Sequence, residues 1–110
     1  MKQTSVTHKD HYGAWTSKTQ IELPNDHILE FSTSKRSSGI LSTTATVHKV
    51  EGQFMTHRMF QDYSKQIIAE KVRVTEKAVR AQHAVALQQL EQVLSEVKAR
   101  YNFEQAAETA

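Results

Sequence analysis

Residues 40–50 read Ile-Leu-Ser-Thr-Thr-Ala-Thr-Val-His-Lys-Val, and their alternation decides the fold class. In a β-strand, successive side chains point to opposite faces of the sheet. The more apolar face of this segment would carry Leu41, Thr43, Ala45 and Val47. The opposite face would be rich in hydroxyl groups and would carry Ser42, Thr44, Thr46 and His48. This pattern predicts a strand with one face on a core and the other in solvent.

Further strands are predicted on both sides of this segment. Residues 19–23 and 27–33 alternate in the same way and are separated by the turn cluster Pro24-Asn25-Asp26. On the other side, Glu51-Gly52 is a tight hairpin signal that leads into residues 53–60. We therefore expect a four-stranded antiparallel β-meander over residues 14–61.

The remainder of the chain differs in composition. No Gly or Pro follows Gly52, and residues 62–110 are rich in good helix formers. Asp62 or Ser64 can cap a helix start, so we expect one long C-terminal amphipathic helix to about residue 103 and a short tail. The run at residues 71–75 alternates like a strand, so the helix could break there, but no turn residue supports a break. Residues 1–13 are polar and aperiodic and predict a flexible N-terminal arm, which completes a single α+β domain.

The predicted helix is too long for the predicted sheet to cover. At 100° per residue, one stripe about 120° wide contains Val79, His83, Ala86, Leu87, Leu90, Val93, Leu94, Val97 and Tyr101. We expect this stripe to pack on a second copy of the helix, so that the chain is a homo-oligomer, with a dimer favoured. The alternative is a helix that breaks and folds back within a single chain.

The composition excludes several classes of function. The chain has 110 residues, no cysteine, and 14 Lys and Arg against 12 Asp and Glu, for a formal charge of +2. Cysteine-containing zinc sites and thiolate nucleophiles are therefore excluded, and the charge is too small to indicate nucleic-acid binding by composition alone. No apolar run suggests a membrane span or a secretory signal, and we expect a cytoplasmic protein without a membrane partner.

Motifs of catalysis are also missing from the sequence. It contains no glycine-rich phosphate loop, nucleophile elbow or paired-histidine metalloprotease motif. His8 and His11 have a spacing that can ligate a metal, but no helix is predicted there that would place both rings on one face. We therefore expect a protein that is not an enzyme and holds neither a cofactor nor a metal.

Two kinds of binding surface remain as candidates. A basic loop and helix face could contact nucleic-acid phosphates through Lys35, Arg36, Arg73, Lys77 and Arg80. A sheet edge, or the hydroxyl-rich sheet face, could pair with a protein partner; the candidate residues of that face are Ser32, Ser42, Thr44, Thr46 and His48.

The sequence thus predicts a small non-enzymatic, homo-oligomeric protein-binding or assembly module that dimerises through its helix. An accessory or inhibitory protein of a mobile element, or a subunit of a larger complex, would have these properties. Nucleic-acid binding through the basic half of the helix and the Lys35-Arg36 loop is the alternative. It ranks second because aromatic residues that could stack on bases are few.

Overall fold

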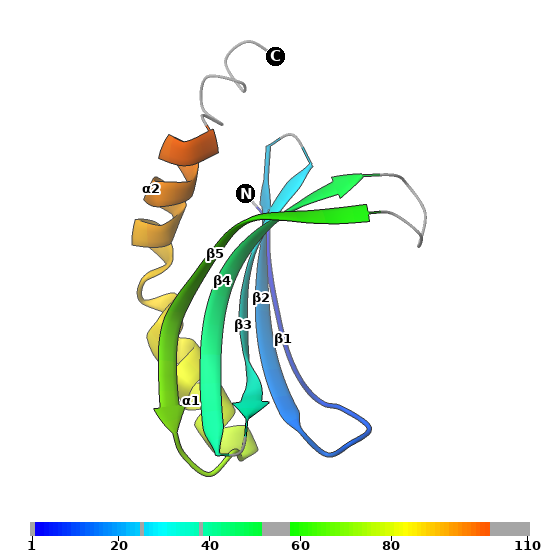
Figure 1. Ribbon diagram of the computed structural model, residues 1–110, viewed down its shortest axis with the longest axis vertical. Helices are drawn as coiled ribbons and strands as arrows, with labels where there is room; N and C mark the ends of the chain where they lie inside the picture. The colour runs from blue at the N-terminus through cyan, green and yellow to red at the C-terminus, as the bar shows by residue number, and fades with distance from the viewer. Residues whose placement is uncertain (1, 25, 38, 52–57, 102–110) are drawn as a thin grey trace.

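The computed structural model describes residues 2–24, 26–37, 39–51 and 58–101 (Figure 1). Five strands come first in the chain: β1 (Gln3–Lys9), β2 (Trp15–Leu23), β3 (His27–Ser37), β4 (Ile40–Glu51) and β5 (Arg58–Lys71). Two helices follow, α1 (Glu76–Leu87) and α2 (Leu90–Tyr101). The prediction of an α+β fold with an antiparallel sheet is confirmed.

The strands form one antiparallel sheet in the order β1-β2-β3-β4-β5. Each strand pairs with the next strand in the sequence, as in a meander. The sheet is strongly curved, and both helices contribute to the core on the same face of it (Figure 1). This face is called the inner face below, and the opposite one the outer face.

The prediction of four strands and one long helix is wrong at the beginning of the chain. Residues 3–9, expected in a flexible arm, form β1 and pair with β2 from Gln3–Ile21 to Lys9–Trp15 without a register shift. The strand is held by backbone hydrogen bonds, and its side chains are largely exposed. An edge strand of this kind needs no apolar face, so its sequence lacks the alternation that marks the central strands.

The same prediction is wrong after residue 61. Residues 62–71, expected in the helix, complete β5, which pairs with β4 from Glu51–Arg58 to Ile40–Lys71. Two register shifts interrupt this pairing, and Ile67 and Ile68 both pack against the core. Pairing along all of β4 outweighs the weak preference of these residues for a helix. The hairpin signal at Gly52 and most of the expected strand 53–60 lie outside the described residues.

The helical part starts later than expected and is divided in two. Thr75 caps α1, because its side-chain oxygen accepts a hydrogen bond from the N–H of Ala78 at 3.1 Å. After α1, the N–H groups of Gln88 and Gln89 donate to carbonyls three residues earlier, at 3.1 and 3.0 Å, and this tighter turn separates α1 from α2. The expected helix end near residue 103 lies outside the described residues. Neither helix is both long and apolar enough to cross a membrane.

The apolar side of the sequence alternation forms the inner face of the sheet. Leu41, Thr43, Ala45 and Val47 of β4 are all 0 % exposed. Leu29 and Phe31 of β3 pack beside them in the core, together with residues of both helices. The inner-face positions of β4 that period-two alternation predicts are therefore all buried.

The helical stripe that we expected to face a second copy lies against the chain's own sheet. Its fully buried members are Val79, Ala86, Val93 and Val97, and His83 is 7 % exposed. Leu87, Leu90 and Leu94 are partly buried against the same core, and the side chain of Tyr101 lies outside the described part of the structure. The packing requirement that suggested a helix-mediated dimer is thus met within one chain.

Candidate functional site

Four of the five predicted nucleic-acid contacts come together at one end of the molecule. Lys35 and Arg36 lie near the end of β3, Arg73 lies between β5 and α1, and Lys77 lies in the first turn of α1. These segments are neighbours because Lys35 pairs with Leu41, Leu41 pairs with Glu70, and Val72 N–H donates to the carbonyl of Gly39 at 2.8 Å. Together with Lys71, these residues form what we call the basic end, the lower end in Figure 1.

The cations of the basic end are unpaired, and the exposed carboxylate of Glu70 lies next to Lys71 in the sequence. All five side chains are exposed, and none forms an ion pair with another described residue. The fifth predicted contact, Arg80, lies one turn further along α1 and forms an ion pair with Glu76 at 3.0 Å. The carboxylate of Glu76 is therefore engaged, and the basic end presents several cations to solvent.

An apolar pocket opens at the same end. It lies between α1 and the ends of β4 and β5 and has a volume of about 270 Å³. Small side chains on α1 leave this space, and the lining residues are Leu41, Ile68, Glu70, Val72, Ala78, Ala81, Gln82 and Val85. The pocket lies just below the size range of sites for drug-sized ligands, which suits a single large apolar side chain or a small apolar molecule.

Only two of the residues that line the pocket are polar, Glu70 and Gln82. The Gln82 amide is engaged with Thr43 and the Leu41 carbonyl, whereas Glu70 is exposed. Lys71 and Lys77 are direct sequence neighbours of the pocket residues Glu70 and Ala78. Val85, at the opening, is a large apolar residue that remains 51 % exposed. An apolar recess therefore lies beside a cluster of cations.

A hydrogen-bonded row of polar side chains crosses the interface between the sheet and α1. Thr19, Thr33 and Thr43 occupy inner positions on β2, β3 and β4, and all three are 0 % exposed. His83 lies with Nε2 2.7 Å from Thr19 Oγ1 and with Nδ1 2.7 Å from Thr33 Oγ1. Thr33 Oγ1 in turn lies 2.6 Å from Thr43 Oγ1, and Gln82 completes the row beyond Thr43. We call this the buried polar row.

The hydrogen bonds of Gln82 determine which group donates and which accepts in each contact of the row. Gln82 Nε2 donates to the carbonyl oxygen of Leu41 at 3.1 Å, and a carbonyl can only accept. The Gln82 oxygen Oε1 therefore faces Thr43, whose hydroxyl donates to it at 2.9 Å. A hydroxyl has one proton, so Thr43 accepts from Thr33, and Thr33 accepts from the Nδ1–H group of His83.

The hydrogen bond between Thr33 and His83 also determines the proton position on the imidazole. Its Nδ1 carries the proton, and Nε2 accepts from the hydroxyl of Thr19, which accepts from Ser5 at 2.9 Å. Burial lowers the pKa of His83, which favours this neutral form. A hydroxyl beside an imidazole base is also an arrangement of nucleophilic catalysis. Here Thr19 is fully buried, so no substrate reaches it, and the row joins α1 to the sheet.

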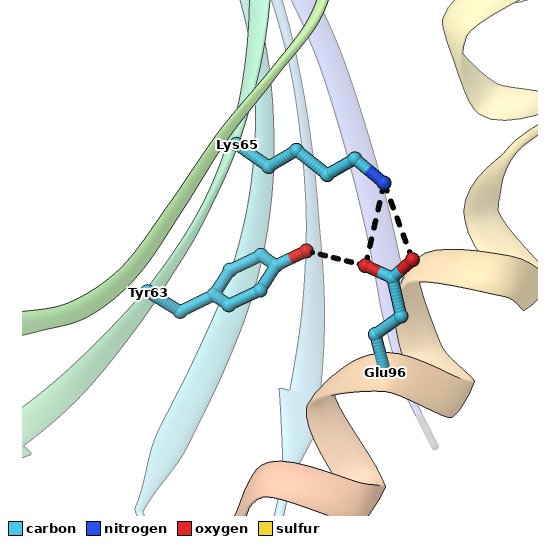
Figure 2. A network of polar contacts seen from close by, with 3 residues as sticks. All are labelled: Tyr63, Lys65 and Glu96. Atoms are coloured by element: carbon cyan, nitrogen blue, oxygen red, sulfur yellow. Dashed lines mark hydrogen bonds and ion pairs between the residues drawn. The ribbon is translucent and has the colours of Figure 1, made fainter.

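A second polar contact joins α2 to β5. The Tyr63 hydroxyl donates to Glu96 Oε2 at 2.9 Å, and Lys65 Nζ lies 3.2 Å from Glu96 Oε1. Figure 2 shows the carboxylate of Glu96 held between these two side chains. The hydrogen bond from Tyr63, followed by that from Lys65, lowers the pKa of Glu96. This cluster positions α2 and is accessible to solvent.

The predicted protein-binding face lies on the outer side of the sheet. Ser32, Thr44, Thr46 and His48 are partly buried there, and Thr46 Oγ1 lies 2.9 Å from His48 Nε2. Ser42 is only 2 % exposed, and its hydroxyl has no partner among the described residues. These five side chains are therefore polar and at least partly covered by their neighbours.

The pocket and the buried polar row were both missed by reasoning from the sequence. The pocket depends on how α1 is placed against β5, which was not predicted as a strand. The row had a signal, because Thr19, Thr33 and Thr43 occupy inner positions on three consecutive strands. Polar residues at equivalent inner positions indicate a shared polar layer, which needs a partner such as His83.

Comparisons with known proteins do not assign the chain to a family. No protein-family model matches the sequence, and no curated protein or solved structure is significantly similar to the chain. Within the described residues, no three His, Asp or Glu side chains gather in a way that could hold a metal ion. His8 lies on β1, and His11 lies in the following turn with its ring centroid 4.1 Å from that of Tyr12.

Proposed function

We propose that this chain is a non-enzymatic binding module whose basic end holds an acidic segment of another protein. The observation that carries the proposal is the open apolar pocket of about 270 Å³ beside unpaired cations. A segment with one large apolar side chain between carboxylates would fill the pocket and meet Arg73 and Lys77. Buried apolar anchors surrounded by charged residues are typical of protein interfaces.

Two contributions to binding follow from this arrangement. Carboxylates near the cations would steer the segment and raise the association rate, and this contribution weakens as salt screens the charges. Removal of the apolar side chain from water would supply a contribution that salt does not weaken. The affinity for the segment should therefore decrease as the salt concentration rises, down to the value that the apolar contact alone provides.

A second candidate partner, single-stranded nucleic acid, is supported by Tyr12. This residue lies in the turn between β1 and β2, at the same end of the sheet as Lys35 and Arg36, because the start of β2 pairs along the end of β3, and it is 86 % exposed. An exposed aromatic ring beside cations can stack on a base. The pocket argues for the protein partner instead, because its apolar lining is aliphatic and offers no ring for stacking.

The two partners can be distinguished by titrations followed through backbone amide NMR shifts. The probes are a blocked peptide Asp-Glu-Phe-Glu-Asp, the same peptide with Ala in place of Phe, and an oligothymidylate. We expect the Phe peptide to shift residues around Ala81 and to bind at least tenfold more tightly than the Ala peptide. Salt should be varied from about 20 to about 150 mM, a range over which screening of exposed charges increases strongly.

Three variants separate the apolar and the charge contributions to peptide binding. Ala81→Leu fills the pocket without a change of charge and should weaken only the Phe peptide. Arg73→Ala with Lys77→Ala should weaken both peptides and reduce the salt dependence, whereas Lys18→Ala, on the outer face, is the matched control. If the oligothymidylate binds more tightly than both peptides and Tyr12→Ala abolishes that binding, the protein-segment proposal is wrong and the nucleic-acid function replaces it.

A further inference from the structure

The two edges of the sheet differ in their backbone regularity. β1 pairs with β2 over all seven of its residues without a register shift. β5, at the opposite edge, contains two register shifts in its pairing with β4. Bulges are a common protection of an edge strand against added strands, as are prolines and inward-pointing charges. β1 contains no proline, and its only inward-pointing charge is Lys9 at the strand end.

The hydrogen bonds at both ends of β1 identify the groups that face outward. Glu22 N–H donates to the carbonyl of Lys2 at 3.0 Å, and Asp10 N–H donates to the carbonyl of Ala14 at 2.9 Å. Hydrogen-bonded pairs alternate with other pairs along an antiparallel ladder, so the even-numbered residues of β1 bond to β2. The N–H and C=O groups of the odd-numbered residues therefore point away from β2, toward an edge at which no other described strand pairs; these residues are Gln3, Ser5, Thr7 and Lys9.

We infer that this edge is a self-association site, at which β1 of a second copy of the chain adds antiparallel about a two-fold axis at Val6. A two-fold axis between antiparallel strands runs perpendicular to the sheet, and it therefore places equivalent faces of both copies on the same side. The two five-stranded sheets become one continuous sheet, and all helices lie on its inner face.

The register centred on Val6 uses the whole strand and opposes no like charges. Ser5 faces Thr7 of the second copy, and Gln3 faces Lys9, in the hydrogen-bonded pairs. Val6 faces its own counterpart in a pair without hydrogen bonds, where side chains approach most closely. Val6 is 52 % exposed on the outer face, so this contact covers apolar surface on both copies. Val and Thr are also favourable strand residues.

Self-pairing of this kind should be weak and concentration-dependent. The contact consists of one strand edge and few apolar side chains, which places it at the small end of specific interfaces. The chain has a mass of 12.5 kDa, and sedimentation equilibrium should show an average mass that rises toward twice this value as concentration increases. A mass that stays at the monomer value up to millimolar protein would overturn the inference.

Cysteine substitution tests the register, because the natural sequence contains no cysteine. Val6→Cys would place two sulfurs on the two-fold axis, where the Cα atoms of such a pair lie about 4.5 Å apart, within the range of a disulfide. Thr4→Cys is the matched control, since Thr4 is exposed on the same face but would oppose His8 of the second copy. Under mild oxidation we expect Val6→Cys to form disulfide-linked dimers at least tenfold faster than Thr4→Cys. Equal rates would overturn the register.

A proline substitution tests the role of the backbone edge. Thr7→Pro removes an N–H group that faces outward and leaves the backbone ladder to β2 intact, although it also removes the side-chain hydrogen bond between Thr7 and Ser17. The average mass of this variant should stay at that of the monomer, while its circular dichroism spectrum remains that of the natural chain. His8→Leu, which keeps every backbone donor, should dimerise like the natural chain. Unchanged dimerisation of Thr7→Pro would show that any self-association uses another surface.

This edge and the basic end can be tested independently. Val6 and Thr7 lie on β1, whereas the pocket lies beside β5 at the opposite side of the sheet. Failure of the disulfide test would leave peptide binding at the pocket unaffected, and loss of peptide binding in Ala81→Leu would leave the dimer intact.

Discussion

His83 on α1 and Thr19 on β2 are 64 positions apart in the sequence, and their atoms Nε2 and Oγ1 lie 2.7 Å apart. This contact and its continuation through Thr33 place a hydrogen-bonded polar row between α1 and the sheet. A fully satisfied polar row permits one position of the helix on the sheet, because any displacement leaves buried groups without partners. The buried polar row therefore determines how α1 docks.

Removal of His83 should destabilise the fold strongly. His83→Ala leaves the buried hydroxyls of Thr19 and Thr33 without a partner and creates a cavity, so we expect a loss of about 2–4 kcal/mol in the free energy of unfolding. Urea denaturation followed by circular dichroism measures this loss. His8→Ala, at an exposed position on β1, is the control and should change stability by less than about 0.5 kcal/mol.

The stability of the fold should decrease as the pH falls below about 6.5, the usual pKa of histidine. Burial lowers the pKa of His83 in the folded chain, so the unfolded chain binds a proton at a higher pH than the folded chain does. The contribution of neutral His83 is thus complete above pH 6.5 and is lost as the pH falls toward the lowered pKa. Urea midpoints at pH 8, 6 and 5 measure this effect.

His83→Gln provides the comparison for that titration. Glutamine can hydrogen-bond to Thr19 and Thr33 but does not titrate, so the variant should lose less stability between pH 8 and pH 5. Measurement at pH 5 and above keeps the carboxylates of Asp10 and Glu96, whose pKa values are lowered, ionised in the folded and largely ionised in the unfolded chain. An identical pH dependence of both proteins would show that His83 does not carry the effect.

Two valines of the helical part should respond differently to truncation. Val97 is 0 % exposed in the core, whereas Val85 is 51 % exposed at the pocket. Val97→Ala should cost about 2 kcal/mol of unfolding free energy, while Val85→Ala should change it by less than about 0.5 kcal/mol. Thermal and urea unfolding of both variants check this difference. Similar losses would mean that α2 is not packed on the sheet as described.

The contact between Tyr63 and Glu96 should be visible in the titration of a single carboxyl group. Tyr63→Phe removes the hydroxyl that donates to Glu96 Oε2, so the pKa of Glu96 should rise toward the usual value of a glutamate. Carboxyl carbon NMR shifts recorded from pH 2.5 to 7 measure this change. The carboxyl of Glu91, also on α2, is the internal control, and a parallel change there would indicate a general loosening of the helix.

The central strands could be predicted because burial imposes a period of two on their side chains. Leu29, Phe31 and Thr33 on one strand and Leu41, Thr43 and Ala45 on the next follow this rule, and all are buried. The edge strands could not be predicted in the same way. β1 has largely exposed side chains, and the register shifts in β5 bring Ile67 and Ile68 to the same core, so neither strand shows a regular alternation.

The division of the helix and the position of the site depend on contacts that are distant in sequence. Nothing local at Gln88 and Gln89 demands a turn, since both are good helix formers. The cations Lys35 and Arg73 could be identified as candidates from the sequence, but their proximity follows from the β4–β5 pairing that was not foreseen. The hydrogen bonds of the threonines in the buried polar row could not be predicted, because they depend on the position of His83 on α1.

The meander order of the strands has a consequence for how the chain folds. Each strand pairs with its neighbour in sequence, so the sheet can form through the closure of short loops, which costs little entropy. The contacts of α1 with β2 and β3 close much longer loops, as the separation of 64 positions between Thr19 and His83 shows. Helix docking should therefore follow the rate-limiting step, and substitutions at His83 should accelerate unfolding while leaving the refolding rate nearly unchanged.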